Sequence, residues 1–176
     1  MEMIKRSFVL LLMMCVVGMG AVQSAMAKTQ WVRVGVTTAS QGTMPAGGAS
    51  YTGGYEYTFW RNGKSVELSG SGDFMMDSSA DGNNRALLPL LVNLRWYSAK
   101  DYTGLYLSGG LGTAIPLGNL HGSTTLAWGG SFGYMTVPGI FLEARYIGRN
   151  QQTIALNGGS FNTNTRFIGG VIGARF

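Results

Sequence analysis

The feature that most constrains the fold is an alternation of apolar and polar residues that recurs in segments of about ten residues. Successive side chains of a β-strand point to opposite faces, so each segment has one apolar and one polar face. In residues 88–96 every even position is Leu, Val or Trp, whereas Asn93 and Arg95 lie on the other face. Eight segments share this pattern: 30–37, 54–61, 65–74, 85–97, 103–115, 124–135, 139–148 and 166–176.

The connections between these segments alternate in length. The short ones contain Asn62-Gly63, residues 98–102 and Val137-Pro138-Gly139, and Asn-Gly is a strong hairpin signal. The longer, polar ones are 39–53, 76–84, 116–123 and 150–165. Barrels of the bacterial outer membrane have short periplasmic turns and longer external loops. The sequence therefore predicts an all-β fold, an eight-stranded antiparallel up-and-down transmembrane β-barrel with both ends on the periplasmic side.

A soluble β-sandwich is the alternative, because it also shows alternation but packs its apolar faces inward. Two features favour the membrane barrel. Aromatic residues gather beside the short connections, at Trp96-Tyr97, Phe59-Trp60 and Tyr134, as in an interfacial belt. The polar faces are rich in Gly, Ser and Thr, which suits a cramped lumen. Pro89 is the weak point in predicting a strand over 85–97, because proline lacks the backbone N–H that a paired strand donates. We therefore expect a bulge or a local bend at this position.

Residues 1–27 have the features of a cleaved export signal: Lys5 and Arg6, then an apolar run, then Ala25-Met26-Ala27. The barrel domain is then 28–176. The only cysteine, Cys15, lies in the signal, so the mature chain has no thiol chemistry. Loss of Lys5, Arg6 and Glu2 changes the net charge from +5 to +4. We expect outer-membrane lipid and lipopolysaccharide phosphates as partners, and no nucleic acid.

The polar faces carry nine charged residues that we expect in the lumen: Arg33, Glu56, Glu67, Asp73, Arg85, Arg95, Glu143, Arg145 and Arg175. Buried charges must be paired, and an eight-stranded barrel is just wide enough for side chains to fill it. We therefore expect a salt-bridge network that plugs the lumen. The alternative is a narrow pore, or a gate that opens when the pairs rearrange.

The last of the eight segments resembles a strand of a known class of proteins. Residues 165–176, which end in Arg175-Phe176, look like the final strand of outer-membrane β-barrel proteins, and this implies that the barrel assembly machinery recognises Phe176. Residues 88–97 and 105–112 resemble the middle strands of the small OmpA/OmpX-like group. The resemblance implies location in the cell outer membrane.

Catalysis is not expected. Lipid A deacylases and palmitoyltransferases are barrels of this size with a catalytic histidine and serine, but here His121 stands alone in a loop near Ser123. Residues 143–149 lack the histidine–serine pair of the deacylases. No metal or cofactor motif is found, and none is expected. The long connections 39–53 and 150–165 suit an adhesin-like contact with a host or surface ligand, or a spacer without a ligand.

Overall fold

The computed structural model describes residues 29–41, 49–77, 85–118, 123–136, 139–150, 152–156, 159–163 and 166–176. The predicted export signal, His121 and the tips of the long connections lie outside these ranges. Among the described residues, no helix is long and apolar enough to cross a membrane.

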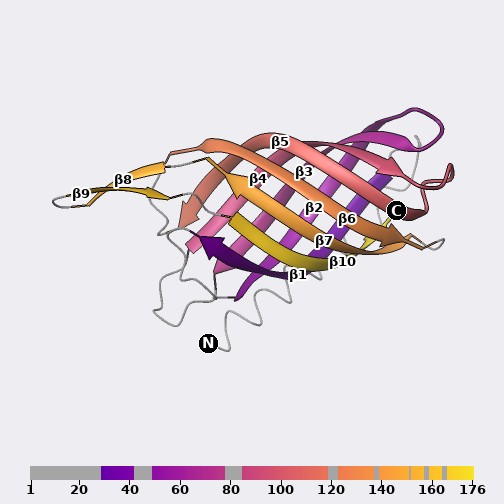
Figure 1. The fold of residues 1–176 in the computed structure, drawn as a ribbon. Coiled ribbons are helices and arrows are strands. Elements are labelled where there is room, and N and C mark those ends of the chain that lie inside the picture. Colours follow the sequence, from indigo (N-terminus) through magenta and orange to yellow (C-terminus); the bar gives the residue numbers. More distant parts are fainter. Residues whose placement is uncertain are drawn as a thin grey trace.

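Eight strands form a closed antiparallel barrel in the order β1-β10-β7-β6-β5-β4-β3-β2, with β1 also paired to β2 (Figure 1). The other two strands, β8 and β9, pair only with each other. The strands are β1 (Thr29–Gln41), β2 (Ala49–Arg61), β3 (Val66–Asp77), β4 (Arg85–Tyr97), β5 (Gly104–Gly118), β6 (Thr125–Met135), β7 (Ile140–Arg149), β8 (Gln152–Leu156), β9 (Gly159–Thr163) and β10 (Arg166–Arg175). The predicted eight-stranded up-and-down barrel is confirmed.

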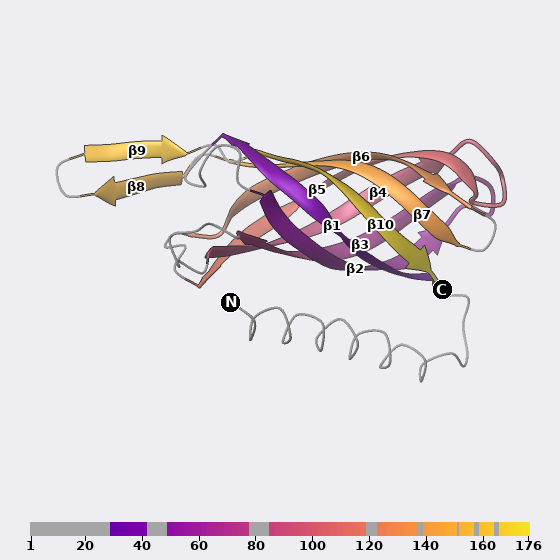
Figure 2. The same cartoon turned by 90° about the horizontal axis from the view of Figure 1, so that it is seen from below.

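The strands run further toward the long connections than the sequence indicated. β2 begins at Ala49, so much of the predicted loop 39–53 is paired strand. The predicted loop 150–165 contains the β8–β9 hairpin, so describing it as a loop was wrong. Figure 2 shows this hairpin projecting beyond the barrel at the end opposite the C-terminus. We call these two ends the long-loop end and the short-turn end.

The barrel is apolar outside and largely polar inside, which excludes the soluble sandwich. Large apolar side chains cover the outer wall, and Leu111 and Leu142 are 65% and 66% exposed. Such a continuous apolar surface is rare on soluble monomers but matches a lipid environment. Facing the lumen, Arg33, Glu67 and Asp73 are almost completely buried. The chain is thus a transmembrane β-barrel.

Of the aromatic residues expected in the outer belt, Phe59 and Trp60 face outward and Tyr97 does not. The register between β2 and β3 shifts between Thr58 and Trp60, so a bulge lets both Phe59 and Trp60 point outward. Strict alternation along β2 would turn Trp60 into the lumen together with Glu56, and the bulge instead brings it into the outer belt where the aromatic residues were expected. Tyr97, expected in the outer belt beside Trp96, is fully buried inside because the alternation of β4 continues to its last residue.

Pro89 is accommodated without the expected bulge. The β3–β4 register is the same on both sides of it, Gly72 facing Leu90 and Met75 facing Leu87. No pairing is recorded between these two points, which is where the missing donor of Pro89 would interrupt the ladder. β4 instead stays paired to β5 through Pro89 and Ala114.

Candidate functional site: the charge network and the closed lumen

The centre of the lumen holds a network of buried ion pairs built around Arg33 of β1. Its Nε and Nη2 donate to the two carboxylate oxygens of Asp73 on β3, at 2.6 and 2.9 Å. Its Nη1 donates to Glu56 of β2 at 2.6 Å. This two-pronged geometry between a guanidinium and a carboxylate is among the strongest charged hydrogen bonds in proteins. Arg33 therefore links three neighbouring strands from inside.

Arg95 of β4 extends the network toward the short-turn end. It lies 2.9 Å from Glu56 and 2.8 Å from Glu67 of β3. Hydroxyl groups satisfy further acceptor sites of these carboxylates: Ser69 donates to Glu56 at 2.5 Å and Tyr97 donates to Glu67 at 2.8 Å. Buried carboxylates need such additional donors, because two charges taken out of water are not compensated by their mutual attraction alone.

Arg145 of β7 carries the network across the lumen. Its Nη1 donates to Asp73 at 2.7 Å, although β7 and β3 are not neighbours in the sheet. Its Nε lies 3.8 Å from Glu143, which also accepts a hydrogen bond from Tyr106 at 2.9 Å. Charges of opposite sign thus alternate from one wall of the barrel to the other.

The structure brings together seven of the nine predicted lumen charges. Arg175 lies apart from them at the short-turn end, where its Nη1 donates to the backbone oxygen of Tyr102 at 2.7 Å. The side chain of Arg85 lies outside the described part of the structure, although its backbone pairs with Gly118 at the long-loop end. Arg61, which was not predicted, joins the network at 3.2 Å from Glu67.

An aromatic layer closes the lumen below the network, at the short-turn end. Trp31 packs edge-to-face on Phe141, with ring centroids 5.1 Å apart, and Tyr97 packs on Tyr106 at 5.6 Å. The guanidinium of Arg95 lies 3.9 Å from the centre of the Trp31 ring, so the charge network rests directly on this layer.

An apolar layer lies on the other side of the network, toward the long-loop end. It consists of Met75, Leu87, Leu91, Ala114, Ala127, Ile147 and Phe167. Leu87 and Leu91 lie on the face of β4 that also carries Arg95, which the sequence analysis treated as polar. Two layers without charge therefore enclose the ion pairs, and the lumen resembles a packed core rather than a channel.

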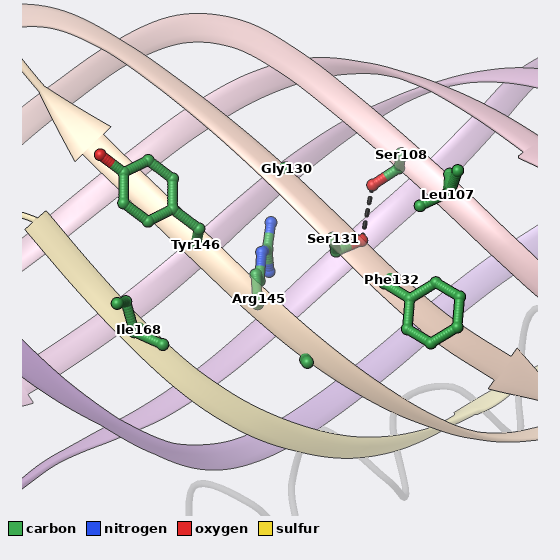
Figure 3. Close-up of a pocket in the computed structure, with 9 residues that line it drawn as sticks. Leu107, Ser108, Gly130, Ser131, Phe132, Arg145, Tyr146 and Ile168 are labelled. Atoms are coloured by element: carbon green, nitrogen blue, oxygen red, sulfur yellow. Dashed lines mark hydrogen bonds between the residues drawn. The ribbon is translucent and has the colours of Figure 1, made fainter.

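The wall formed by β5, β6, β7 and β10 has a hollow of about 460 Å³. Figure 3 shows the residues that line it. Gly130 leaves space between the larger side chains of Phe132, Tyr146 and Ile168. A hydrogen bond of 2.6 Å between the hydroxyl groups of Ser108 and Ser131 lies beside it. The exposed rim is apolar, which suits lipid chains rather than a polar substrate.

Groups suited to metal binding or nucleophilic catalysis do not gather in the described residues. No three His, Cys, Asp or Glu side chains among them are placed to hold a metal ion. Ser123 is described, but His121 is not, so the geometry of this pair lies outside the described residues. The charged side chains described in the centre of the lumen form ion pairs with one another.

Comparison with solved structures finds barrels of the same kind. Neisserial surface protein A (NspA) has a TM-score of 0.61 and 13% sequence identity, covering 88% of this chain and 100% of that one. Ail, the attachment invasion locus protein of Yersinia pestis, has a TM-score of 0.54 and 12% identity, covering 86% and 100%. The outer membrane enzyme PagL has a TM-score of 0.55 and 15% identity, covering 83% and 98%.

These identities are low, so the comparisons speak to the fold. The chain has the fold of the small eight-stranded outer-membrane β-barrels, as its resemblance to the OmpA/OmpX-like group implied. No protein-family model matches the sequence, and no curated protein sequence matches it either.

Proposed function

We propose that this protein is a non-enzymatic integral protein of the outer membrane whose closed barrel displays a surface-binding hairpin. The observation that carries the proposal is the β8–β9 hairpin, which extends past the barrel rim (Figure 1). Each of its strands pairs on one side only, so among the described strands two backbone edges remain free. Free strand edges are templates for adding a strand from another chain.

The filled lumen supports a scaffold role over a pore. An ion crossing the barrel would have to displace the aromatic layer, the ion pairs and the apolar layer in turn. Steady single-channel conductance in planar bilayers tests the pore alternative, and the proposal requires that the purified protein give none.

The proposed location follows from the fold and the signal-like N-terminus. Residues 1–27 would direct export, and lipid and lipopolysaccharide would surround the apolar wall. Phe176, which is 59% exposed, would be available to the barrel assembly machinery at the end of β10. Phe176→Ala is then expected to lower the amount of folded barrel in the membrane without changing the unfolding midpoint of the protein that does fold.

The surface role is tested by replacing residues 152–163 with a short Gly-Ser linker. Cells that produce the wild-type protein should adhere to an epithelial monolayer, and cells with the replaced hairpin should lose this adhesion. The barrel should still change its gel mobility on boiling, because the hairpin pairs with no barrel strand. Asp101→Ala, in an exposed turn at the opposite end, is the control and should adhere normally. Unchanged adhesion after replacement would contradict the proposal.

The enzyme alternative is tested separately. Similarity to PagL concerns the fold, and transfer of its activity would require catalytic groups that the described residues do not assemble. An unchanged lipid A mass profile in cells that overproduce the protein is the result that a non-enzymatic role requires.

A further inference from the structure

Arg149, the last residue of β7, is a buried cation that forms no ion pair with the side chains that the structure describes. The residue is 2% exposed, and its Nε and Nη1 make no hydrogen bond. It continues the inward-facing series of Glu143, Arg145 and Ile147 and lies at the long-loop end of the lumen, opposite Ala127 of β6. The predicted strand, 139–148, ends one residue earlier, so Arg149 was not among the predicted lumen charges.

The surroundings of Arg149 do not neutralise it. Its inward neighbours Ala127, Ile147 and Phe167 belong to the apolar layer. Each inward-facing carboxylate that the structure describes is already paired with another arginine. These carboxylates are Glu56, Glu67, Asp73 and Glu143. A buried charge without a counter-charge is strongly unfavourable. Among the side chains that the structure describes, none supplies a counter-charge to Arg149, and a bound anion would supply it.

A hydroxyl group without a partner lies beside it. Thr125 faces the lumen two residues before Ala127, which makes it a diagonal neighbour of Arg149 on the inner face. Such neighbours lie about 7–8 Å apart, within reach of a long side chain. The Oγ1 of Thr125 is buried and makes no hydrogen bond. Buried polar groups are almost always bonded, and one polar group bound between Arg149 and Thr125 would satisfy both.

We propose that Arg149 and Thr125 form a binding site for an oxyanion: a phosphate, sulfate or carboxylate group, free or carried by a larger molecule. The planar guanidinium presents parallel N–H groups that match two oxygens of such an anion. The threonine hydroxyl supplies a further donor. Access is from the long-loop end, because the ion pairs and the aromatic layer fill the rest of the lumen. The site is independent of the proposed role of the β8–β9 hairpin.

Thermal unfolding of the purified full-length barrel in a nonionic detergent tests the proposal with inorganic phosphate as the probe. Sodium chloride keeps the ionic strength constant. The midpoint of wild type should rise saturably by several degrees, because a ligand that binds only the folded state stabilises it. Arg149→Met should show no such rise. Without phosphate it should unfold at or above the wild-type temperature, since it removes an unpaired buried charge.

Two further variants separate the site from general charge effects. Thr125→Val keeps the shape but removes the hydroxyl, and should weaken phosphate binding severalfold. Arg166→Gln removes an exposed arginine at the same end of β10 and should respond like wild type. A wild-type response in Arg149→Met, or equal loss of response in Arg166→Gln, would overturn the site.

Vesicles distinguish the source of the anion. Wild type and Arg149→Met are compared in phosphatidylcholine vesicles with and without phosphatidic acid, and then with added phosphate. An Arg149-dependent rise with added phosphate alone identifies a free oxyanion. A rise only with phosphatidic acid identifies a lipid headgroup. If neither phosphate nor phosphatidic acid stabilises wild type in detergent or in vesicles, the proposal is wrong.

Discussion

Asp73 is the carboxylate that links Arg33 of β1 to Arg145 on the opposite wall of the barrel. It is fully buried and accepts hydrogen bonds from both Arg33 and Arg145. Asp73→Asn preserves the size of the side chain, removes its charge and turns an amide N–H₂ group toward arginine donors. Removing one partner of a buried ion pair costs about 3–5 kcal/mol. Arg145 would retain only Glu143, at 3.8 Å, so we expect a loss of about 4 kcal/mol in the free energy of unfolding.

Urea unfolding in detergent micelles, followed by tryptophan fluorescence, measures this loss. With a slope of about 2 kcal/mol per molar urea, it lowers the midpoint by about 2 M. Asp101→Asn is the matched control, because Asp101 is an exposed carboxylate in the β4–β5 turn, and it should lower the midpoint far less than Asp73→Asn. Combining Asp73→Asn with Arg145→Gln should recover part of the loss, since it removes the orphaned cation.

A shift for Asp73→Asn no larger than that for Asp101→Asn would refute the reasoning. It would mean that water reaches the ion pairs and screens them, and that the layers above and below do not seal the lumen.

Three other predictions concern the wall and the turns. A Cβ on Gly112 would collide with the backbone oxygen of Leu90, so Gly112→Val should abolish the change in gel mobility on boiling, and a normal change would contradict the packing. Leu111→Arg, at the middle of β5, should lower the free energy of unfolding in vesicles by about 2–4 kcal/mol. Leu105→Arg, near the short-turn end, should lower it by about 0–1 kcal/mol. Equal losses would refute the membrane depth assigned to the two residues. The Thr103 hydroxyl donates to Asp101 and lowers the pKa of that carboxyl, so Thr103→Val should raise the pKa toward its ordinary value in a pH titration by carboxyl ¹³C NMR. The stabilising effect of this bond is complete above the ordinary pKa and is lost as the pH falls through the lowered one; an unmoved pKa would exclude the bond.

The sequence predicts the sheet wherever the alternation is unbroken. The bounds of β4 match the predicted 85–97. Its outer face is apolar throughout, and Asn93 and Arg95 identify the other face as the inner one. The bulge beside Phe59 was not predictable, because two adjacent aromatic residues fit either face and only the pairing with β3 decides between them. The short β8–β9 strands were missed because five residues are too few to establish a period.

The ion pairs themselves could be predicted only as a set. Alternation places Arg33 and Asp73 on the inner face, but the partner of each charge depends on the stagger between strands, which the sequence does not state. The apolar layer was missed because Leu87 and Leu91 are apolar on a face assumed to be polar. The inward orientation of Arg149 could be predicted from the sequence, because the alternation that places Glu143 and Arg145 on the inner face reaches it four residues after Arg145.

The seam between β1 and β10 has a consequence for how the chain folds. Gln30 and Phe176 exchange backbone hydrogen bonds of 3.0 and 2.9 Å, so the first and last strands of the barrel are joined directly. These are the contacts of greatest sequence separation in the sheet, and the entropy of closing so long a loop makes them slow to form. Every partially synthesised chain therefore carries two unsatisfied edges, which other chains could join. Closure must follow synthesis of the last strand, and until then the edges of β1 and of the latest strand can pair with other chains.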